Sequence, residues 1–141
     1  MSTRSAIGVM HGDKAKVVYC HWDGYLSHNG QILQDHYDSP KANHLVALGD
    51  LSVLGKNIDV PEDREHTFNH PADGVCVFYG RDRGEKDQEY VVVESDTEMY
   101  DQFPWCEYFY VMKEDVWYVS QGPDSKWRRL DMALSAEKVD S

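Results

Sequence analysis

Short apolar runs rich in valine and aromatic residues recur along the chain and are separated by polar turns. Residues of these types fit the pleated, half-buried surface of a sheet, and runs of this length are typical of β-strands. The first two runs are joined by His11-Gly12-Asp13-Lys14, whose Gly-Asp signal predicts a β-hairpin. The pattern predicts six strands, at residues 6–10, 16–22, 75–79, 89–93, 107–112 and 116–120.

Helix signals lie between the second and third predicted strands. Ser27 is a suitable N-cap for a helix that reaches Tyr37. Ser39-Pro40 then begins a second helix, with serine as the cap and proline at the first helical position, and Gly49 ends it. We therefore expect two consecutive helices after the first hairpin.

The remaining segments carry weaker signals. Residues 51–54 are expected to form a short turn, and residues 55–74 lack periodicity and predict a long loop. Residues 80–88 are polar and predict a loop between two strands. At the end of the chain, helical spacing of apolar residues over 126–137 predicts a third helix, whereas Pro123-Asp124 is also compatible with a turn into a final strand.

These elements predict one α+β domain over residues 1–141, with about six strands in a largely antiparallel sheet and two or three helices on one face. Hairpin loops between successive strands argue against a doubly wound parallel sheet, which needs helical crossovers. A chain of this length buries about 70% of its unfolded surface, so its core needs no metal or disulfide.

Charge restricts the partners of the protein. The chain has 25 acidic and 14 basic residues, a formal net charge of −11. Such a charge repels nucleic-acid backbones and anionic membranes, and it favours a partner protein with a basic surface. No stretch approaches the roughly 20 apolar residues of a membrane span. The three cysteines are odd in number and far apart, which indicates reduced thiols in a cytoplasmic protein.

Acidic and aromatic residues gather in the last third of the chain. Over residues 94–115, seven acidic residues face one basic residue, Lys113. Carboxylates around exposed aromatic rings are typical of a protein interface, and such a patch would equally suit self-association. The alternatives are an ordinary solvated surface and an aromatic core. The interface interpretation assigns partner binding to Glu94, Asp96, Glu98, Asp101, Trp105 and Glu107.

A second interpretation places a small anionic, nucleotide-like ligand at a polar pocket. Arg4 precedes the first strand and Asp23 follows the second, so the two lie at the same end of the hairpin and form either a structural ion pair or part of a site. Alternation puts His21 and Trp22 on opposite faces unless the strand bulges. The ligand-binding set is Arg4, His21, Trp22, Asp23, Arg81 and Arg83.

Catalysis and metal binding have little support in the sequence. Cys20 and His21 are strand neighbours that point to opposite faces, and Ser2 would be a nucleophile only after removal of Met1. His66 and His70 have helical spacing but fall in the predicted loop, without the glutamate of a zinc-protease helix. We therefore expect no catalytic residue, no metal and no cofactor, and a binding protein rather than an enzyme.

Three segments carry a family resemblance: Ser2-Thr3-Arg4-Ser5-Ala6-Ile7-Gly8, Tyr19-Cys20-His21-Trp22-Asp23-Gly24-Tyr25, and Gly80-Arg81-Asp82-Arg83-Gly84-Glu85. The chain resembles a family of small, functionally unassigned proteins of bacteriophages and mobile elements, over most of its length up to about residue 93. The resemblance implies a small accessory protein of the host cytoplasm, and it implies inhibition of a host defence factor. The family supplies no catalytic residues.

Overall fold

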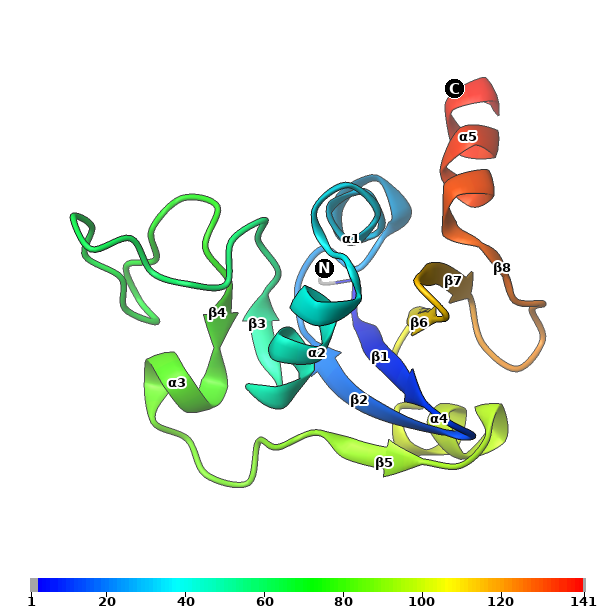
Figure 1. The fold of residues 1–141 in the computed structure, drawn as a ribbon, viewed down its shortest axis with the longest axis horizontal. Helices are drawn as coiled ribbons and strands as arrows, with labels where there is room; N and C mark the ends of the chain where they lie inside the picture. The colour runs from blue at the N-terminus through cyan, green and yellow to red at the C-terminus, as the bar shows by residue number, and fades with distance from the viewer. Residues whose placement is uncertain (1–2, 141) are drawn as a thin grey trace.

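The computed structural model describes the backbone of residues 3–140 and the side chains of residues 3–137. Within that range the protein is one α+β domain built on a single mixed sheet (Figure 1). The strand order is β4-β3-β2-β1-β6-β7-β8, and β5 pairs with the first half of β2, beside β3. The strands are β1 (Ser5–His11), β2 (Lys14–Cys20), β3 (Leu51–Val53), β4 (Val77–Phe78), β5 (Val91–Val93), β6 (Tyr108–Lys113), β7 (Val116–Ser120) and β8 (Arg128–Arg129).

One π-helical turn and four α-helices lie between these strands, and a fifth α-helix follows the last strand. They are η1 (Leu26–Gly30), α1 (Gln31–His36), α2 (Ser39–Ala47), α3 (Tyr79–Arg83), α4 (Asp96–Gln102) and α5 (Leu130–Asp140). No helix among the described residues is long and apolar enough to cross a membrane.

Two predicted hairpins form the centre of the sheet. The β1–β2 hairpin pairs Ser5 with Cys20, and the β6–β7 hairpin pairs Phe109 with Ser120. The first and last thirds of the chain meet where β1 runs parallel to β6. This non-local parallel pair, like the parallel β2–β3 pair, makes the sheet mixed, and it places the start of β1 beside the start of β6.

Each face of the sheet has its own core. On the first face, η1, α1, α2 and α5 cover a large cluster that includes Ile7, Leu45 and Tyr110. The hydroxyl of Tyr110 donates to the carbonyl of Gly24 at 2.6 Å, which ties the sheet to the chain just before η1. On the second face, Met99 of α4 and Phe103, which directly follows α4, join a smaller cluster against Ala6, Val17 and Phe109. The sheet is therefore buried on both sides.

The α+β class is confirmed, and eight strands are present where six were predicted. Helices η1, α1, α2 and α5 gather on one face as expected, whereas α4 covers the other face. Residues 51–54 were expected to be a turn, but Leu51–Val53 forms β3 because it pairs with both β2 and β4. The predicted 80–88 loop begins with α3, whose end is a left-handed Gly84. Both alternatives for the tail occur, since β8 leads directly into α5.

Candidate functional site

The second face of the sheet carries most of the residues that the sequence singles out. Helix α4 crosses this face, with Met99 and Phe103 buried beneath it. Gly8 and Ala15 are small residues on this face, so the sheet surface stays low near the tip of the β1–β2 hairpin. A hollow lies at the hairpin end, and a polar aromatic cluster lies at the other end.

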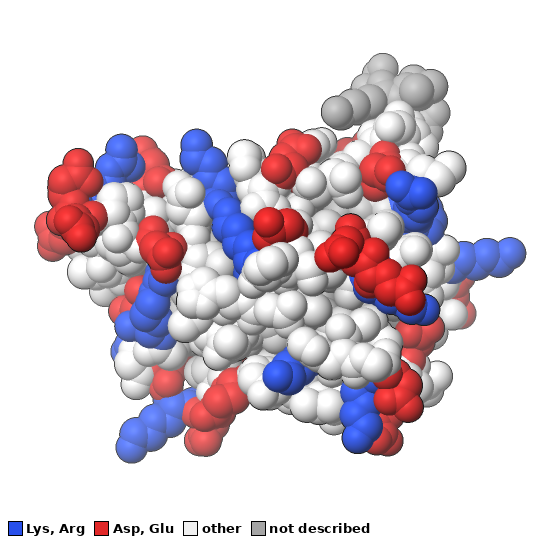
Figure 2. Space-filling model, viewed as in Figure 1, with Lys and Arg blue, Asp and Glu red and all other residues white. Residues whose placement is uncertain are grey.

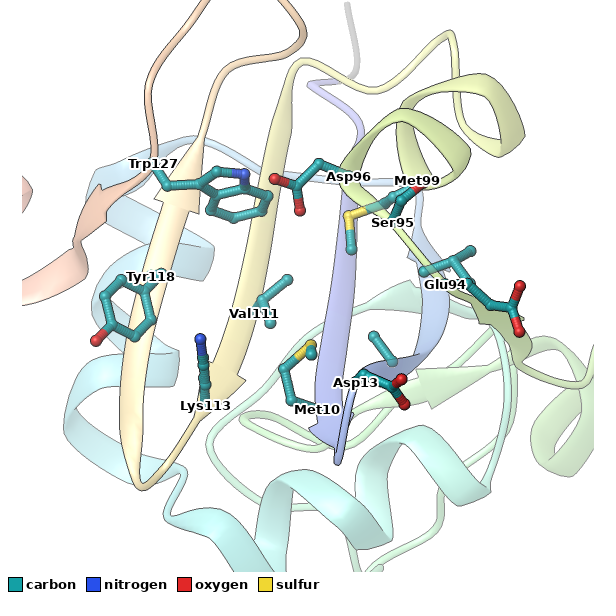
Figure 3. Close-up of a pocket in the computed structure, with 12 residues that line it drawn as sticks. Met10, Asp13, Glu94, Ser95, Asp96, Met99, Val111, Lys113, Tyr118 and Trp127 are labelled. Carbon is teal, nitrogen blue, oxygen red and sulfur yellow. The ribbon is translucent and has the colours of Figure 1, made fainter.

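The hollow encloses about 380 Å³ between α4, the hairpin tip and strands β6 and β7 (Figure 3). Its floor is apolar, and aromatic side chains close one side. Three carboxylates, from Asp13, Glu94 and Asp96, share its lining with one basic residue, Lys113. The lining residues are Met10, Asp13, Ala15, Val93, Glu94, Ser95, Asp96, Met99, Val111, Lys113, Tyr118 and Trp127.

Trp127 gives this hollow a buried hydrogen-bond donor. Its indole Nε1 is buried and makes no hydrogen bond of standard geometry among the described residues, and its weak contact with the Tyr100 hydroxyl only partly offsets the effect of burial, which raises the pKa of Tyr100. The ring stacks on Tyr100 with 6.4 Å between centroids, which fixes its position. Figure 3 shows the Asp96 carboxylate directed toward this indole and Lys113 pointing into the same hollow. An apolar floor under carboxylates suits an aliphatic stem that ends in a positive charge.

The six predicted partner-binding residues do not form one patch. Glu94 and Asp96 line the hollow, and Glu94 also pairs with Lys14 at 3.4 Å. Glu98 takes part in the cap of α4, since its backbone N–H donates to Oγ of the N-cap Ser95 and its carboxylate accepts from the Glu94 N–H. Asp101 is exposed on the same helix. Glu107 and Trp105 follow α4 and lie beside the start of β1, at the opposite end.

The six predicted ligand-binding residues are also divided. The β1–β2 register, extended by one position, sets Arg4 opposite His21. The expected Arg4–Asp23 ion pair is absent from the described residues. Instead, Asp23 has a left-handed backbone, with φ of 57°, and turns the chain so that the Gly24 N–H donates to Thr3 O. The strand ends at Cys20, so alternation no longer separates His21 from Trp22, whose ring centroids lie 4.8 Å apart.

Arg81 and Arg83 lie elsewhere and are engaged in internal contacts. The guanidinium of Arg81 donates to the carbonyls of Ile58 and Cys76 and to the Asp82 carboxylate. Arg83 lies over the Phe68 ring and pairs with Glu85. Strands β2 and β3 separate β1 from β4, so about 14 Å of sheet lies between Arg4 at the start of β1 and the two arginines that follow β4. They do not share one pocket with Arg4.

The cluster at the start of β1 includes residues that the sequence analysis did not assign. Tyr19 lies on the same face as His21, with its hydroxyl 2.7 Å from His21 Nδ1. Their spacing of two along a strand was a usable signal. Asp50 joins the cluster by accepting the Tyr19 N–H at 2.9 Å. That contact depends on the β2–β3 pairing, for which the sequence offers no local signal.

Burial controls the ionisation of this cluster. It raises the pKa of Tyr19 to about 12, against the opposing effect of Arg4, so the phenol stays protonated. Burial lowers the pKa of His21, and the positive charge of Arg4 lowers it further, which favours a neutral imidazole. Burial also raises the pKa of the Asp50 carboxyl from 3.8 to about 6. Arg4 is the permanent charge of the cluster.

The part of the chain that the structure describes contains neither a cluster of metal ligands nor an exposed, activated cysteine among Cys20 and Cys76. No group of three candidate metal ligands is present there. The His66 side chain is fully buried, with Nδ1 accepting from the Ala72 N–H and Nε2 at 3.3 Å from Asp82. Cys20 and Cys76 are buried, and burial raises the pKa of each thiol, to about 12 for Cys20. Buried thiols of this kind are unreactive.

Charge is mixed on the face of the molecule that carries α1 and α2. Figure 2 shows aspartate and glutamate interspersed there with lysine and arginine, without one continuous acidic field. No family model matches this chain, and neither a curated protein nor a solved structure shows significant similarity to it.

Proposed function

We propose that this chain is a binding protein whose hollow beside α4 takes a basic side chain of a partner protein. The observation that carries the proposal is the combination of three carboxylates with an apolar floor, beside a buried Trp127 Nε1 that lacks a hydrogen bond of standard geometry. A lysine or arginine stem would cover Met10 and Met99, while its charge would meet the carboxylates at the rim.

The physical terms of such a contact are individually modest. A cation over the indole of Trp127 contributes about 0.5–2 kcal/mol, depending on how far it is desolvated. The indole N–H gains a hydrogen bond of standard geometry if a carbonyl of the partner backbone lies within reach, which removes the cost of a poorly satisfied buried donor. The net charge of −11 accelerates encounter with a basic surface.

The resemblance to phage and mobile-element proteins suggests who the partner is. On that basis the partner is a host defence factor of the cytoplasm, and occupation of its basic segment is the mode of inhibition. Basic segments commonly contact nucleic acid or nucleotide phosphates, so an acidic protein that covers one would block that contact.

Labelled peptides test the proposal directly. A lysine- and arginine-containing peptide and its charge-neutral counterpart of equal length are titrated against the protein by fluorescence anisotropy. We expect the basic peptide alone to bind, and Asp96→Lys to weaken it by about tenfold or more. The matched control is Glu62→Lys, which makes the same charge change on the exposed 55–74 loop.

The comparison of the two variants distinguishes binding at the hollow from attraction by the overall negative charge of the protein. An Asp96→Lys loss that exceeds the Glu62→Lys loss supports the site. Equal losses in both variants would mean that only the overall charge matters, and unchanged binding by Asp96→Lys would remove the hollow from consideration. Failure of every basic peptide to bind would reject the proposal itself.

A further inference from the structure

Arg4 is a half-buried cation without a counter-charge. Its Nε is buried and lacks a hydrogen-bond partner, and no carboxylate of the described residues forms an ion pair with it. Asp50 and Glu107 lie within electrostatic range of Cys106, as Arg4 does, yet neither pairs with Arg4. A buried N–H of a charged group that has no acceptor is costly, so an anion is the expected missing partner.

The groups around Arg4 are arranged to leave that positive charge in place. His21, directly opposite, is kept neutral by burial and by Arg4. The tautomer in which the Tyr19 hydroxyl donates to Nδ1 carries the ring proton on Nε2, and in that tautomer His21 is a second donor for an anion. The Asp50 carboxylate is occupied by the Tyr19 N–H. One guanidinium and one imidazole N–H suit a single phosphate group.

A row of aromatic rings passes beside this donor pair. The ring centroids of Trp22 and His21 lie 4.8 Å apart, those of His21 and Tyr19 6.0 Å, and those of Tyr19 and Trp105 6.2 Å. The two tryptophans at its ends are 43% and 49% exposed, so part of each side chain is accessible to a ligand. Exposed indole faces stack on planar heteroaromatic rings, at about 1–3 kcal/mol for a nucleobase.

We infer that the cluster of Arg4, Tyr19, His21 and Trp105 binds a mononucleotide, with Arg4 on the phosphate and a tryptophan on the base. The net charge of −11 repels polyanions, which favours a ligand with one phosphate over a nucleic-acid chain. The site is independent of the proposed partner-binding hollow, because the two lie at opposite ends of β1.

Three small probes and four variants test this inference by calorimetric titration. AMP carries both ring and phosphate, adenosine only the ring, and inorganic phosphate only the anion. We expect AMP to bind at least about tenfold more tightly than either fragment. Arg4→Gln should lower AMP affinity to that of adenosine, and Trp105→Ala should weaken AMP and adenosine together. Arg83→Gln, an exposed arginine on α3, is the matched control and should change AMP affinity by less than about twofold.

Arg4→Lys is a second test of the role of Arg4 in case Arg4→Gln does not fold. The lysine keeps the charge and loses the planar fork, so its AMP affinity should lie between those of the native protein and adenosine-level binding. Native AMP affinity in Arg4→Gln, or AMP affinity no higher than that of adenosine, would overturn the inference. Arg4-dependent binding of a glutamate-containing peptide without AMP binding would also overturn it and assign the surface to a protein ligand.

Discussion

Two buried side-chain donors hold the helical layer to the sheet at single points. Tyr110 is fully buried and its hydroxyl donates to Gly24 O, while the indole of Trp117 donates to Tyr37 O at 2.9 Å. Tyr110→Phe leaves the Gly24 carbonyl buried without its donor, so we expect a loss of about 1–3 kcal/mol in the free energy of unfolding, measured in urea. Tyr25→Phe, at an exposed tyrosine, is the control and should change stability by less than about 0.5 kcal/mol. Equal losses in both would exclude the Gly24 contact as the cause.

Asp50 gives the fold a pH dependence of predictable sign. Its pKa is raised to about 6 in the folded protein, so the folded state binds the proton more tightly than the unfolded state. Stability therefore falls as pH rises from about 4 to about 6, and ionised Asp50 remains unfavourable above that window. The full shift corresponds to about 3 kcal/mol, which solvent screening at this half-buried position reduces to about 1 kcal/mol.

Replacement of Asp50 by asparagine tests that linkage. Asp50→Asn keeps an oxygen for the Tyr19 N–H and removes the charge. We expect the variant to be more stable than the native protein at pH 7 by about 1 kcal/mol, with the difference vanishing below pH 4. Denaturant unfolding across this pH range measures it, with the exposed Asp124→Asn as control. A pH-independent difference would contradict the raised pKa.

Helix α4 is short, and its first turn is held by a cap. Ser95 accepts the Glu98 N–H at 3.1 Å, and the Glu98 carboxylate accepts the Glu94 N–H. Ser95→Ala should cost about 0.5–2 kcal/mol of stability and also weaken basic-peptide binding, because α4 forms a wall of the hollow. Thermal unfolding and peptide titration measure the two effects. Ser135→Ala, exposed on α5, should show neither, and a stability loss without a binding loss would mean that α4 does not shape the hollow.

Helix α4 was not predicted from the sequence, whereas the two hairpins were. The hairpins followed from turn residues and strand-length apolar runs, which are local signals. Helix α4 was missed because Met99 is its only buried residue and leaves no apolar periodicity, although Ser95 and Glu98 at cap spacing were a usable sign. Strand β3 has three residues and exists through its pairing with β2 and β4, which no local pattern records.

The arrangement of the whole molecule decides which candidate residues meet. The β1–β2 hairpin register brings Arg4 close to His21, so this proximity was predictable from the sequence. Glu94 and Trp105 are close along the chain, yet α4 lies between them and separates them on the sheet face. The distance between Arg4 and Arg81 depends on the order of the strands across β2 and β3, which is set by non-local pairing. Proximity in space was predictable here only where one hairpin determines it.

The two proposed sites lie on one face of the sheet. We expect binding at one site not to affect binding at the other, because the fold holds them far apart. Arg4 and Met10 at the hollow are six positions apart along the strand, about 20 Å in an extended chain. The Debye length is about 8 Å at physiological ionic strength and about 30 Å at 10 mM. Charge at one site should therefore be felt at the other only in dilute salt.

A double-mutant cycle of Arg4→Gln and Asp96→Lys, read out by AMP and basic-peptide affinities, measures this coupling. At physiological ionic strength we expect the two changes to add within about 0.5 kcal/mol for each ligand. At 10 mM salt Asp96→Lys should tighten AMP binding, because it removes a negative charge and adds a positive one on the same face. Coupling above about 1 kcal/mol at physiological ionic strength would contradict independence, because screened charges cannot supply it over this distance and a change in the packing of α4 on the sheet would have to carry it.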